Sequence, residues 1–393
     1  MSALCYGCLV TLRDFPVATK LPDGMQQAAD ADTPSGSTSA VPLPAYVEQA
    51  AHGRKFTDFL GEALETPGIL GQEKAQVDSV LSHDDGVIVG KGKWDGEDAI
   101  IKCANYKIHS TTIEYEMGAC VMLQDAAQYF KGSNDDGQQF VADYKDRFEA
   151  KLAAPLPKHY CFVTSYDGDK TLGEYIRPMD APQRLEAAVL FADQLLRGIT
   201  YLHRIGLVHR DIKLENVVIK EGKPPKATII DFDLAKGIRL NHAKESSMRN
   251  QLPSGSLKYM SPELLRDKAR DLRKSDMWAL GVLIFEVLHK QSPFLVAYLR
   301  AAVSNNLNIY RNHIIQLLTK PMRLPMPASL DDYFAVQKKT FELVTYEIYT
   351  MMIPREKDRP TPQTYREWKR ALPKLTVNDY KTKWHVHIDY QFK

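Results

Sequence analysis

The distribution of apolar and polar residues divides the chain into a strand-rich part and a helix-rich part. Short apolar or alternating runs predict strands at Val80–Leu81, Val87–Trp94 and Ala99–Lys102, with Asp95–Gly96 as the turn of a hairpin. Tyr160–Tyr166 is a further apolar run of strand length. The stretch from 128 to 158 is longer than a usual connection, and we interpret it as an insertion.

Apolar residues at helical spacing predict two main helices. The first extends from Thr111 to about Gln124, and the second from Ala181 to His203. The apolar stripe of the second helix consists of Leu185, Val189, Leu196, Ile199 and Leu202. The length of this stripe is typical of a buried helix, which would deliver the chain into a polar loop that begins at His209.

Two short apolar runs adjoin this polar loop. Leu214–Ile219 leads away from it, and Ala227–Ile230 leads directly into Asp231. Both runs are typical of short buried strands. Such strands would hold the two acidic groups, Asp211 and Asp231, at adjacent strand ends.

The polar residues of the loop suit phosphoryl transfer. Asp211 would accept the proton of an incoming hydroxyl, and Lys213 would neutralise charge on the moving phosphoryl group. Asn216 and Asp231 would hold the magnesium ions that bridge the phosphates. A lone His-Arg-Asp sequence would be interpreted as a solvated charged loop, but the additional residues at these offsets favour a catalytic site.

The stretch from His209 to Asn216, followed by Asp231-Phe232-Asp233, resembles the catalytic loop and the magnesium-binding motif of the eukaryotic protein kinases. The resemblance implies an α+β, bilobal fold with a small β-rich N-lobe carrying one main helix and a larger, mainly helical C-lobe. It also implies ATP and Mg²⁺ as cofactors and transfer of the γ-phosphoryl group to protein substrates. Lys213 favours serine or threonine as the acceptor, because tyrosine-directed relatives usually change this part of the loop.

The same resemblance assigns an ATP-binding lysine and its partner. Ala99–Lys102 is similar to the Val-Ala-Ile-Lys of the third kinase strand, which makes Lys102 the phosphate-binding lysine. Its ion-pair partner would be a glutamate of the following helix. The apolar pattern favours Glu116, which lies next to the apolar face, and Glu114 is the rival.

The glycine loop over the phosphates departs from the family pattern. Gly90-Lys91-Gly92 lies too close to Lys102, so residues 82–86 form the better register and retain only the last family glycine. Ser82 or His83, and Asp84, occupy positions where the backbone approaches phosphates. In this register, the ATP-binding positions of the loop and of the hinge between the lobes are Leu81, Ser82, Gly86, Ile88, Thr164, Ser165, Tyr166 and Asp167.

Motifs far from the loop agree with it in order and spacing. The stretch that ends at Glu263 resembles the substrate-docking loop of serine/threonine kinases, in which Ser256 would lie near the catalytic residues. The resemblance further implies that Asp276 braces the catalytic-loop backbone and that Arg359 pairs with Glu263. Arg210 is the expected docking site for a phosphate of the activation segment.

Asp233 departs from the glycine that the family usually has after the Asp-Phe pair. Glycine tolerates positive φ there, whereas aspartate tolerates it less well. The switch of Phe232 between inward and outward positions is therefore expected to be restricted.

Composition narrows the class of protein further. The chain has a formal net charge of +2 over 393 residues, which gives no electrostatic case for nucleic acid or a membrane surface as a partner. Its five scattered cysteines suit free thiols in a reducing compartment. No apolar run is long enough to span a bilayer, and the first residues lack the basic start of a signal peptide. We therefore expect a soluble, intracellular protein, with the choice between cytoplasm and nucleus and the oligomeric state left open.

Four segments are expected along the chain. Residues 1–45 form a disordered N-terminal tail, because the segment is rich in small and polar residues. Residues 46–75 form a helical N-terminal extension. The kinase domain covers 76–372, with the N-lobe at 76–166 and the C-lobe at 167–372. In the C-terminal tail, 373–393, the alternation from Trp384 to Tyr390 predicts an edge strand or a packed tail.

Three functions compete on these residues. The first is an active serine/threonine protein kinase. The second is a catalytically weak or inactive kinase-fold scaffold, which the degraded glycine loop and Asp233 support. The third is a small-molecule kinase of the aminoglycoside or choline type, which shares the aspartates and the asparagine but would not need Glu263 or Arg359.

Overall fold

The computed structural model describes residues 75–84, 86–129, 137–150, 159–238, 255–266, 268–319, 335–372, 374–386 and 388. The predicted disordered tail at 1–45 and almost all of the predicted helical extension at 46–75 lie outside the described residues, as do Asp85 and the side chains of His83 and Asp84.

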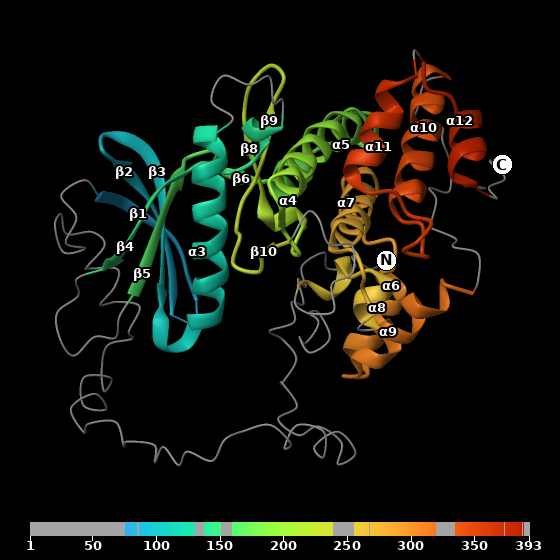
Figure 1. Ribbon diagram of the computed structural model, residues 1–393. Helices are drawn as coiled ribbons and strands as arrows, with labels where there is room; N and C mark the ends of the chain where they lie inside the picture. The colour runs from blue at the N-terminus through green and yellow to red at the C-terminus, as the bar shows by residue number, and fades with distance from the viewer. Residues whose placement is uncertain are drawn as a thin grey trace, which may run out of the picture.

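The N-lobe is a five-stranded antiparallel sheet with one long helix packed against it (Figure 1). The strand order is β1-β2-β3-β5-β4. The bounds are β1 (Ala75–Asp84), β2 (Val87–Trp94), β3 (Glu97–Asn105), α3 (Tyr106–Tyr129), β4 (Tyr144–Ala150) and β5 (His159–Ser165). Asp95 and Gly96 join β2 to β3 with φ of 52° and 83°. A two-residue hairpin turn of this type needs positive φ at both positions, so the predicted turn is confirmed.

Strand β4 corrects the interpretation of residues 128–158 as an insertion. Tyr144–Ala150 pairs with β5 and forms an edge of the sheet. Its buried residues are confined to the two ends, Tyr144 and Ala150, while Phe148 between them is half-buried. Such an edge strand lacks the regular alternation of a half-buried strand, and for this reason the pattern did not reveal it.

The two faces of the sheet bury different residues. Ala104 and Phe162 lie on the face that joins the main core beneath α3. Ile101, Cys103 and Val163 lie in a separate cluster on the opposite face. Because side chains alternate along a strand, Lys102 on β3 shares the face of α3, and this places it toward the C-lobe elements described below.

Cys103 and Cys161 form a disulfide, which corrects the expectation of free thiols at these two positions. The two residues are direct partners in the β3–β5 register, and their Cα atoms lie 4.0 Å apart. Nothing in their separate sequence contexts indicated that they face each other. Cys120 in α3 is a buried free cysteine, as expected.

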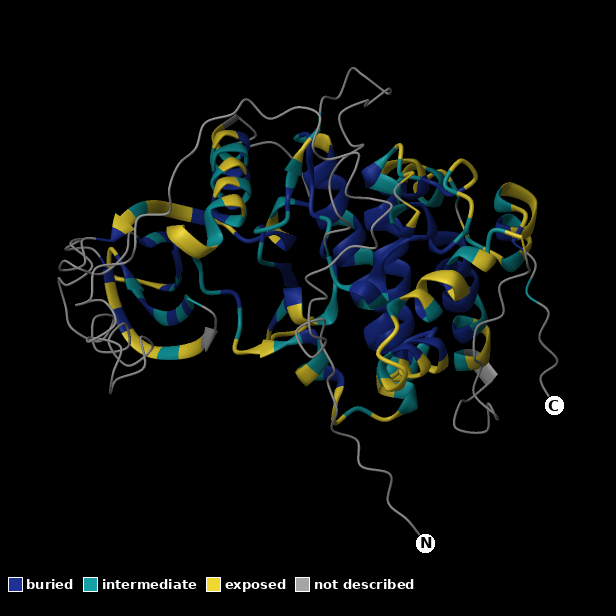
Figure 2. Ribbon diagram, turned by 90° about the horizontal axis from the view of Figure 1, so that it is seen from below, coloured by how far each residue is buried: buried dark blue, intermediate teal, exposed yellow. Residues whose placement is uncertain are grey.

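The C-lobe is mainly helical, and its buried residues gather in the helices at its centre (Figure 2). Its first part comprises β6 (Lys170–Thr171), α4 (Leu172–Ile176), α5 (Ala181–Arg204), β7 (Leu207–Val208), a 3-10 turn (Leu214–Asn216), β8 (Val217–Lys220), β9 (Lys226–Ile229) and β10 (Lys236–Gly237). The remainder comprises a 3-10 turn (Leu257–Tyr259), α6 (Pro262–Leu265), α7 (Leu272–His289), α8 (Leu295–Val303), α9 (Leu307–Gln316), α10 (Ala335–Met351), α11 (Pro362–Arg370) and α12 (Val377–Trp384).

Helices α5 and α7 form the centre of this lobe. Residues from Ser275 to Leu288 in α7 are all buried, as expected for a helix surrounded by others. The apolar stripe of α5 is buried except at Val189, which is 44% exposed. The pair of strands β8 and β9 packs beside α5 and positions the polar loop that precedes β8.

Within the described residues of the predicted tail, 374–386 and 388, the chain forms a helix and a packed end and no strand. Helix α12 ends at Trp384, and His385 follows in the left-handed conformation with φ of 53°. Tyr380 and Val386 are buried. Trp368 of α11 contacts the rings of Tyr380 and Trp384. Of the two alternatives for this tail, the structure bears out packing in the described residues.

No helix within the described ranges is long and apolar enough to cross a membrane.

Candidate active site

Lys102 of β3 lies between two carboxylates that come from different lobes. Its Nζ is 3.0 Å from Oε2 of Glu116 in α3 and 2.6 Å from Oδ1 of Asp231, which follows β9. Glu116 is buried, whereas Glu114, the rival partner, is exposed. The geometry therefore selects Glu116 as the ion-pair partner. It also brings the predicted lysine and the predicted metal ligand into contact.

Charge pairing outweighs burial at this lysine. Burial disfavours its charged form, but Asp231 and Glu116 raise the pKa of Lys102 well above its usual value. The pKa of Asp231 is lowered, because Lys102 outweighs the burial of the carboxyl group. Burial raises the pKa of Glu116 in spite of Lys102. Both carboxylates thus contact Lys102, and burial opposes the charged form of Glu116 more than that of Asp231.

The catalytic-loop residues converge on the carboxylate of Asp211. Lys213 Nζ donates to Asp211 Oδ2 at 2.5 Å, and Asn216 Nδ2 donates to the same oxygen at 3.1 Å and to the Asp211 carbonyl at 2.9 Å. The backbone N–H of Ser256 donates to Asp211 Oδ1 at 2.8 Å. Lys213 Nζ also lies 3.2 Å from Ser256 Oγ. Four of the residues predicted near the reacting groups, Asp211, Lys213, Asn216 and Ser256, are thus in contact.

Asp276 of α7 fixes the backbone of this loop. Its Oδ2 accepts from the N–H of His209 at 3.0 Å, and its Oδ1 accepts from the N–H of Arg210 at 2.9 Å. His203 Nε2 of α5 lies 2.7 Å from Oδ2. These bonds lower the pKa of Asp276 although burial opposes the shift. Arg210 has φ of 70°, so the bonds also hold a backbone conformation that side chains disfavour.

His209 packs under the Asp-Phe-Asp motif. Its Nδ1 accepts from the N–H of Asp211 at 3.3 Å, and its Nε2 lies 3.0 Å from the carbonyl of Ile230. These partners place the ring proton on Nε2. The ring centroid lies 4.9 Å from that of Phe232, which is fully buried. His209 is therefore positioned to buttress the loop.

Tyr144 of β4 joins this packing to the glutamate of α3. Its ring contacts Phe232 edge-on at 6.0 Å between centroids, and its hydroxyl donates to Glu116 Oε1 at 2.9 Å. Sequence reasoning missed this residue, since it lies on the strand that was interpreted as an insertion. A tyrosine preceded and followed by charged residues carried no signal of such a contact.

Asp233 is a third carboxylate near Lys102, in addition to Glu116 and Asp231. Burial and the charge of Asp231 raise the pKa of Asp233 to about 6. Asp231 has φ of 67°, whereas Asp233 is not among the described residues with positive φ. In this conformation Asp233 carries no strain from a positive φ, and the expected restriction of the Phe232 switch stays a prediction.

Two further predicted residues form a buried ion pair. Arg359 Nη1 and Nη2 donate to Oε1 and Oε2 of Glu263 at 2.6 and 3.1 Å. Arg359 is 1% exposed and also donates to the carbonyls of Ile353, Lys274 and Pro354. Arg359 lowers the pKa of Glu263 although burial opposes the shift. The expected partnership of docking loop and late arginine is present.

Arg210 lies in the same region as the Asp-Phe-Asp motif. Its Nη1 donates to the carbonyl of Leu234 at 3.3 Å. Burial lowers the pKa of Arg210, and Tyr115 of α3 and Asp276 oppose this shift. Residues 239–254, in which a docked phosphate was expected, lie outside the described residues.

The predicted glycine-loop residues are only partly brought to the site. Gly86 has φ of 82°, which glycine adopts readily. Ser82 is exposed and Leu81 is 57% exposed, at a bulge of β1. Ile88 is wrong as an ATP-binding residue: it pairs with Cys103, is 2% exposed and belongs to the opposite face of the sheet.

The residues of β2 that share the face of Lys102 are Val87, Val89, Lys91 and Lys93, of which the two valines are apolar. Val89 is the direct cross-strand partner of Lys102, and Val87 packs against the main core. The predicted register placed Ile88 on this face instead, and a slip of one residue moves a side chain to the other face.

The hinge residues already have partners within the protein. The N–H of Ser165 donates to the carbonyl of Asp143 at 2.9 Å, and the N–H of Tyr166 donates to the carbonyl of Asp98 at 3.4 Å. Asp167 is buried and accepts from Ser165 Oγ and from Lys226 Nζ of β9. Thr164 is half-buried and pairs with Ile100 in β3. These contacts tie the end of β5 to both lobes.

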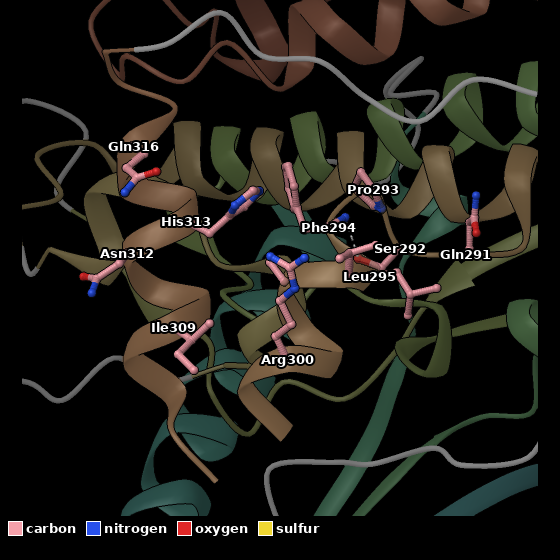
Figure 3. A pocket seen from close by; sticks show the side chains of 12 residues that line it. Gln291, Ser292, Pro293, Phe294, Leu295, Arg300, Ile309, Asn312, His313 and Gln316 are labelled. Carbon is pink, nitrogen blue, oxygen red and sulfur yellow. Dashed lines mark hydrogen bonds between the residues drawn. The ribbon is translucent and has the colours of Figure 1, made fainter. Parts of the chain in front are cut away.

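The C-lobe also contains a hollow that lies apart from the predicted site residues. It measures about 560 Å³ and lies between α8 and α9, where Phe294, Ile309 and Arg300 are among its lining residues (Figure 3). None of the predicted site residues lines it.

Comparisons with known proteins agree with this geometry. The family model described as "Protein kinase domain" matches residues 94–367. Serine/threonine-protein kinase SAPK3 of Oryza sativa subsp. indica is 31% identical over 138 residues, which are 35% of this chain and 39% of the relative. Serine/threonine-protein kinase AtPK1/AtPK6 of Arabidopsis thaliana is 24% identical over 239 residues, or 60% and 46% of the two chains. Serine/threonine-protein kinase 40 of Homo sapiens is 29% identical over 191 residues, or 46% and 42%.

In each of these alignments the chain spans less than half of the relative's length. The family model, in contrast, covers well over half of this chain and includes both lobes of the fold. The matched region contains the lysine, the catalytic loop and the late arginine. The chain therefore belongs to the protein kinase domain family.

Proposed function

We propose that this protein is an ATP- and Mg²⁺-dependent serine/threonine protein kinase. The observation that carries the proposal is the convergence of Lys102, Glu116 and Asp231 from two lobes, with Asp211 and its partners adjacent in the loop. Catalysis of phosphoryl transfer depends mainly on positioning and charge stabilisation, and these residues supply both.

The donor set fits magnesium. Asp231 offers carboxylate oxygens, and Asn216 uses its Nδ2 to hold Asp211, so its amide oxygen is the atom directed to a cation. No cluster of three or more His, Cys, Asp or Glu side chains suited to a metal occurs among the described residues. Mg²⁺ is commonly bound by one or two carboxylates together with substrate phosphates and water, which agrees with such a sparse set. Bound Mg²⁺ would neutralise charge on the phosphates.

Asp211 is arranged to accept a substrate hydroxyl. A carboxylate offers about four acceptor positions, and three of them are used by Lys213, Asn216 and the N–H of Ser256. The remaining position, on Oδ1, is where the hydroxyl of a substrate would donate. The ammonium group of Lys213 would then lie next to the transferring group.

The identity of the acceptor follows from the loop around Asp211. Lys213 and Ser256 lie within hydrogen-bonding distance of each other, so the docking loop and the catalytic loop form one surface. The resemblance to serine/threonine kinases, and the names of the three relatives, support serine or threonine as the phosphorylated residue.

A kinase-fold scaffold is the second candidate, and Asp233 favours it. A third carboxylate next to Asp231 adds negative charge where a polyphosphate would lie once its proton is lost above about pH 6. The acidic sequence Asp84-Asp85 in the predicted glycine loop would likewise repel the negative charges of a polyphosphate. This candidate predicts a folded protein that neither transfers phosphate nor depends on Mg²⁺ for nucleotide binding.

Phosphotransfer from radiolabelled ATP to a basic protein substrate tests the proposal, with acid hydrolysis to identify the labelled amino acid. We expect phosphoserine or phosphothreonine, and a rate that falls about 100-fold or more in Asp211→Asn. Asp125→Asn, which removes an exposed carboxylate at the end of α3, is the matched control and should keep the rate. Equal rates in wild type and Asp211→Asn, or no transfer by either, would contradict the proposal.

A further inference from the structure

Strand β4 holds helix α3 at two points that lie about two helical turns apart. Tyr144 Oη donates to Glu116 Oε1 at 2.9 Å, and the carbonyl of Tyr144 accepts from Gln124 Nε2 at 3.3 Å. Arg147, further along β4, donates from Nη1 to Gln124 Oε1 at 2.7 Å. Both the backbone and the side chain of Tyr144 therefore contact the helix that carries the glutamate of the candidate site.

The ring of Tyr144 is fixed by packing as well. It lies edge-on to Phe162 of β5, with 6.3 Å between the ring centroids, and its contact with Phe232 holds it from another side. Tyr144 is 5% exposed. Burial, and then the charge of Glu116, raise the pKa of Tyr144 well above its usual value. The hydroxyl therefore stays protonated and remains a donor to the carboxylate.

The two carboxylate oxygens of Glu116 have different partners. Oε1 accepts from Tyr144, and Oε2 lies 3.0 Å from Nζ of Lys102. The terminal torsion of a glutamate has a broad energy minimum, so packing alone does not set the direction of its oxygens. A hydrogen bond that holds Oε1 limits this rotation. The hydroxyl of Tyr144 thus keeps Oε2 directed toward Lys102.

This orientation matters most when Asp231 no longer pairs with Lys102. In the structure, Lys102 is shared between two carboxylates, and its contact with Asp231 is the shorter one, at 2.6 Å. In the function proposed above, Asp231 binds the metal and Lys102 binds the phosphates. Glu116 is then the carboxylate that keeps Lys102 in place, and the direction of Oε2 determines where Nζ lies.

We propose that Tyr144 is a positioning residue of the nucleotide site: its hydroxyl orients Glu116 and, through Glu116, holds Lys102 within reach of the phosphates of ATP. The inference rests on the proposed function and adds a residue to it. Tyr144 acts through Glu116 alone, so its effect should be confined to ligands that carry phosphates.

Calorimetric titration of the full chain with ATP and Mg²⁺, and separately with adenosine, tests this role. Tyr144→Phe removes the hydroxyl and keeps the ring. We expect its Kd for ATP with Mg²⁺ to rise about tenfold, as for the loss of one hydrogen bond to a charged group. Its Kd for adenosine should stay within about twofold of the wild-type value, because adenosine lacks the phosphates that Lys102 would bind.

Two further variants separate positioning from stability. Tyr380→Phe is the matched control, because it removes a buried hydroxyl that lies 3.1 Å from the hydroxyl of Tyr365 in the C-lobe. It should leave both Kd values unchanged. In a Glu116→Ala background, Tyr144→Phe should change the Kd for ATP by less than about twofold, because the residue through which it acts is gone. The comparison of the two tyrosine variants is sufficient even if Glu116→Ala does not fold.

Three results would overturn the role of Tyr144. The first is an equal Kd for ATP with Mg²⁺ in the wild type and in Tyr144→Phe. The second is an equal loss of affinity for ATP and for adenosine, which would assign Tyr144 a purely structural role. The third is an undiminished effect of Tyr144→Phe in the Glu116→Ala background. A wild-type chain that does not bind ATP with Mg²⁺ would instead refute the proposed function, and the role of Tyr144 with it.

Discussion

Replacing Asp233 by asparagine should stabilise the protein, and the gain should depend on pH. The substitution removes the carboxyl charge and keeps the shape of the side chain. In the folded protein, burial and the charge of Asp231 raise the pKa of Asp233 from 3.8 to about 6. The folded state therefore binds this proton more tightly than the unfolded chain does. Between these two pKa values, the free energy of unfolding of the wild type falls as the pH rises.

The size of the effect follows from the shift. A rise of about two pKa units, at about 1.4 kcal/mol per unit, makes the ionised side chain cost about 3 kcal/mol at pH 8. At about pH 5 the same linkage leaves roughly half of this cost, and below the unfolded pKa it disappears. Asp233→Asn should thus exceed the wild type in free energy of unfolding by about 3 kcal/mol at about pH 8 and by about half of that at about pH 5.

Urea denaturation followed by circular dichroism at both pH values measures this difference. Asp125→Asn on α3 is the control for loss of a carboxylate, and as an exposed substitution it should change the free energy by less than about 0.5 kcal/mol at either pH. A variant of Asp233 that is no more stable than the wild type at pH 8, or whose advantage is the same at both pH values, would refute the electrostatic account of this position.

Two further substitutions test contacts of the site. Tyr144→Phe removes the buried hydroxyl that donates a hydrogen bond to Glu116. The free energy of unfolding should fall by about 1–2 kcal/mol. A change within the error of urea denaturation would show that this hydrogen bond contributes nothing to stability. Arg359→Lys replaces a guanidinium that binds both carboxylate oxygens of Glu263. It should lower the free energy of unfolding by about 3 kcal/mol, because a lysine leaves the buried carboxylate with fewer partners. A variant that melts at the same temperature as the wild type would contradict this.

The charged residues of the site could be predicted because each has a chemical role and a motif that fixes its spacing. Asp211, Asn216 and Asp231 lie in one short region of the sequence, so their proximity follows from two adjacent strand ends. The hairpin at Asp95–Gly96 could be predicted for a similar reason, because the turn residues carry the local signal.

Features that depend on register could not be predicted. Strand β1 contains bulges between Val77 and Ser79 and between Val80 and Ser82, so the pairing of β1 with β2 cannot be counted from the sequence. A slip of one residue assigned Ile88 to the wrong face. The contact of Cys103 with Cys161 likewise requires the exact pairing of β3 with β5.

The most direct test of the account is the thermal stability of the purified chain with ATP, measured with and without Mg²⁺. Saturating ligand at about 100 times its Kd should stabilise the wild type by about 2.7 kcal/mol when Mg²⁺ is present. Lys102→Met and Asp231→Asn should lose most of this gain, because the two side chains are in contact at 2.6 Å at the centre of the proposed site. A wild-type protein that gains no stability from ATP with Mg²⁺, or variants that gain as much as the wild type, would contradict the central claim that these residues bind the nucleotide and its metal.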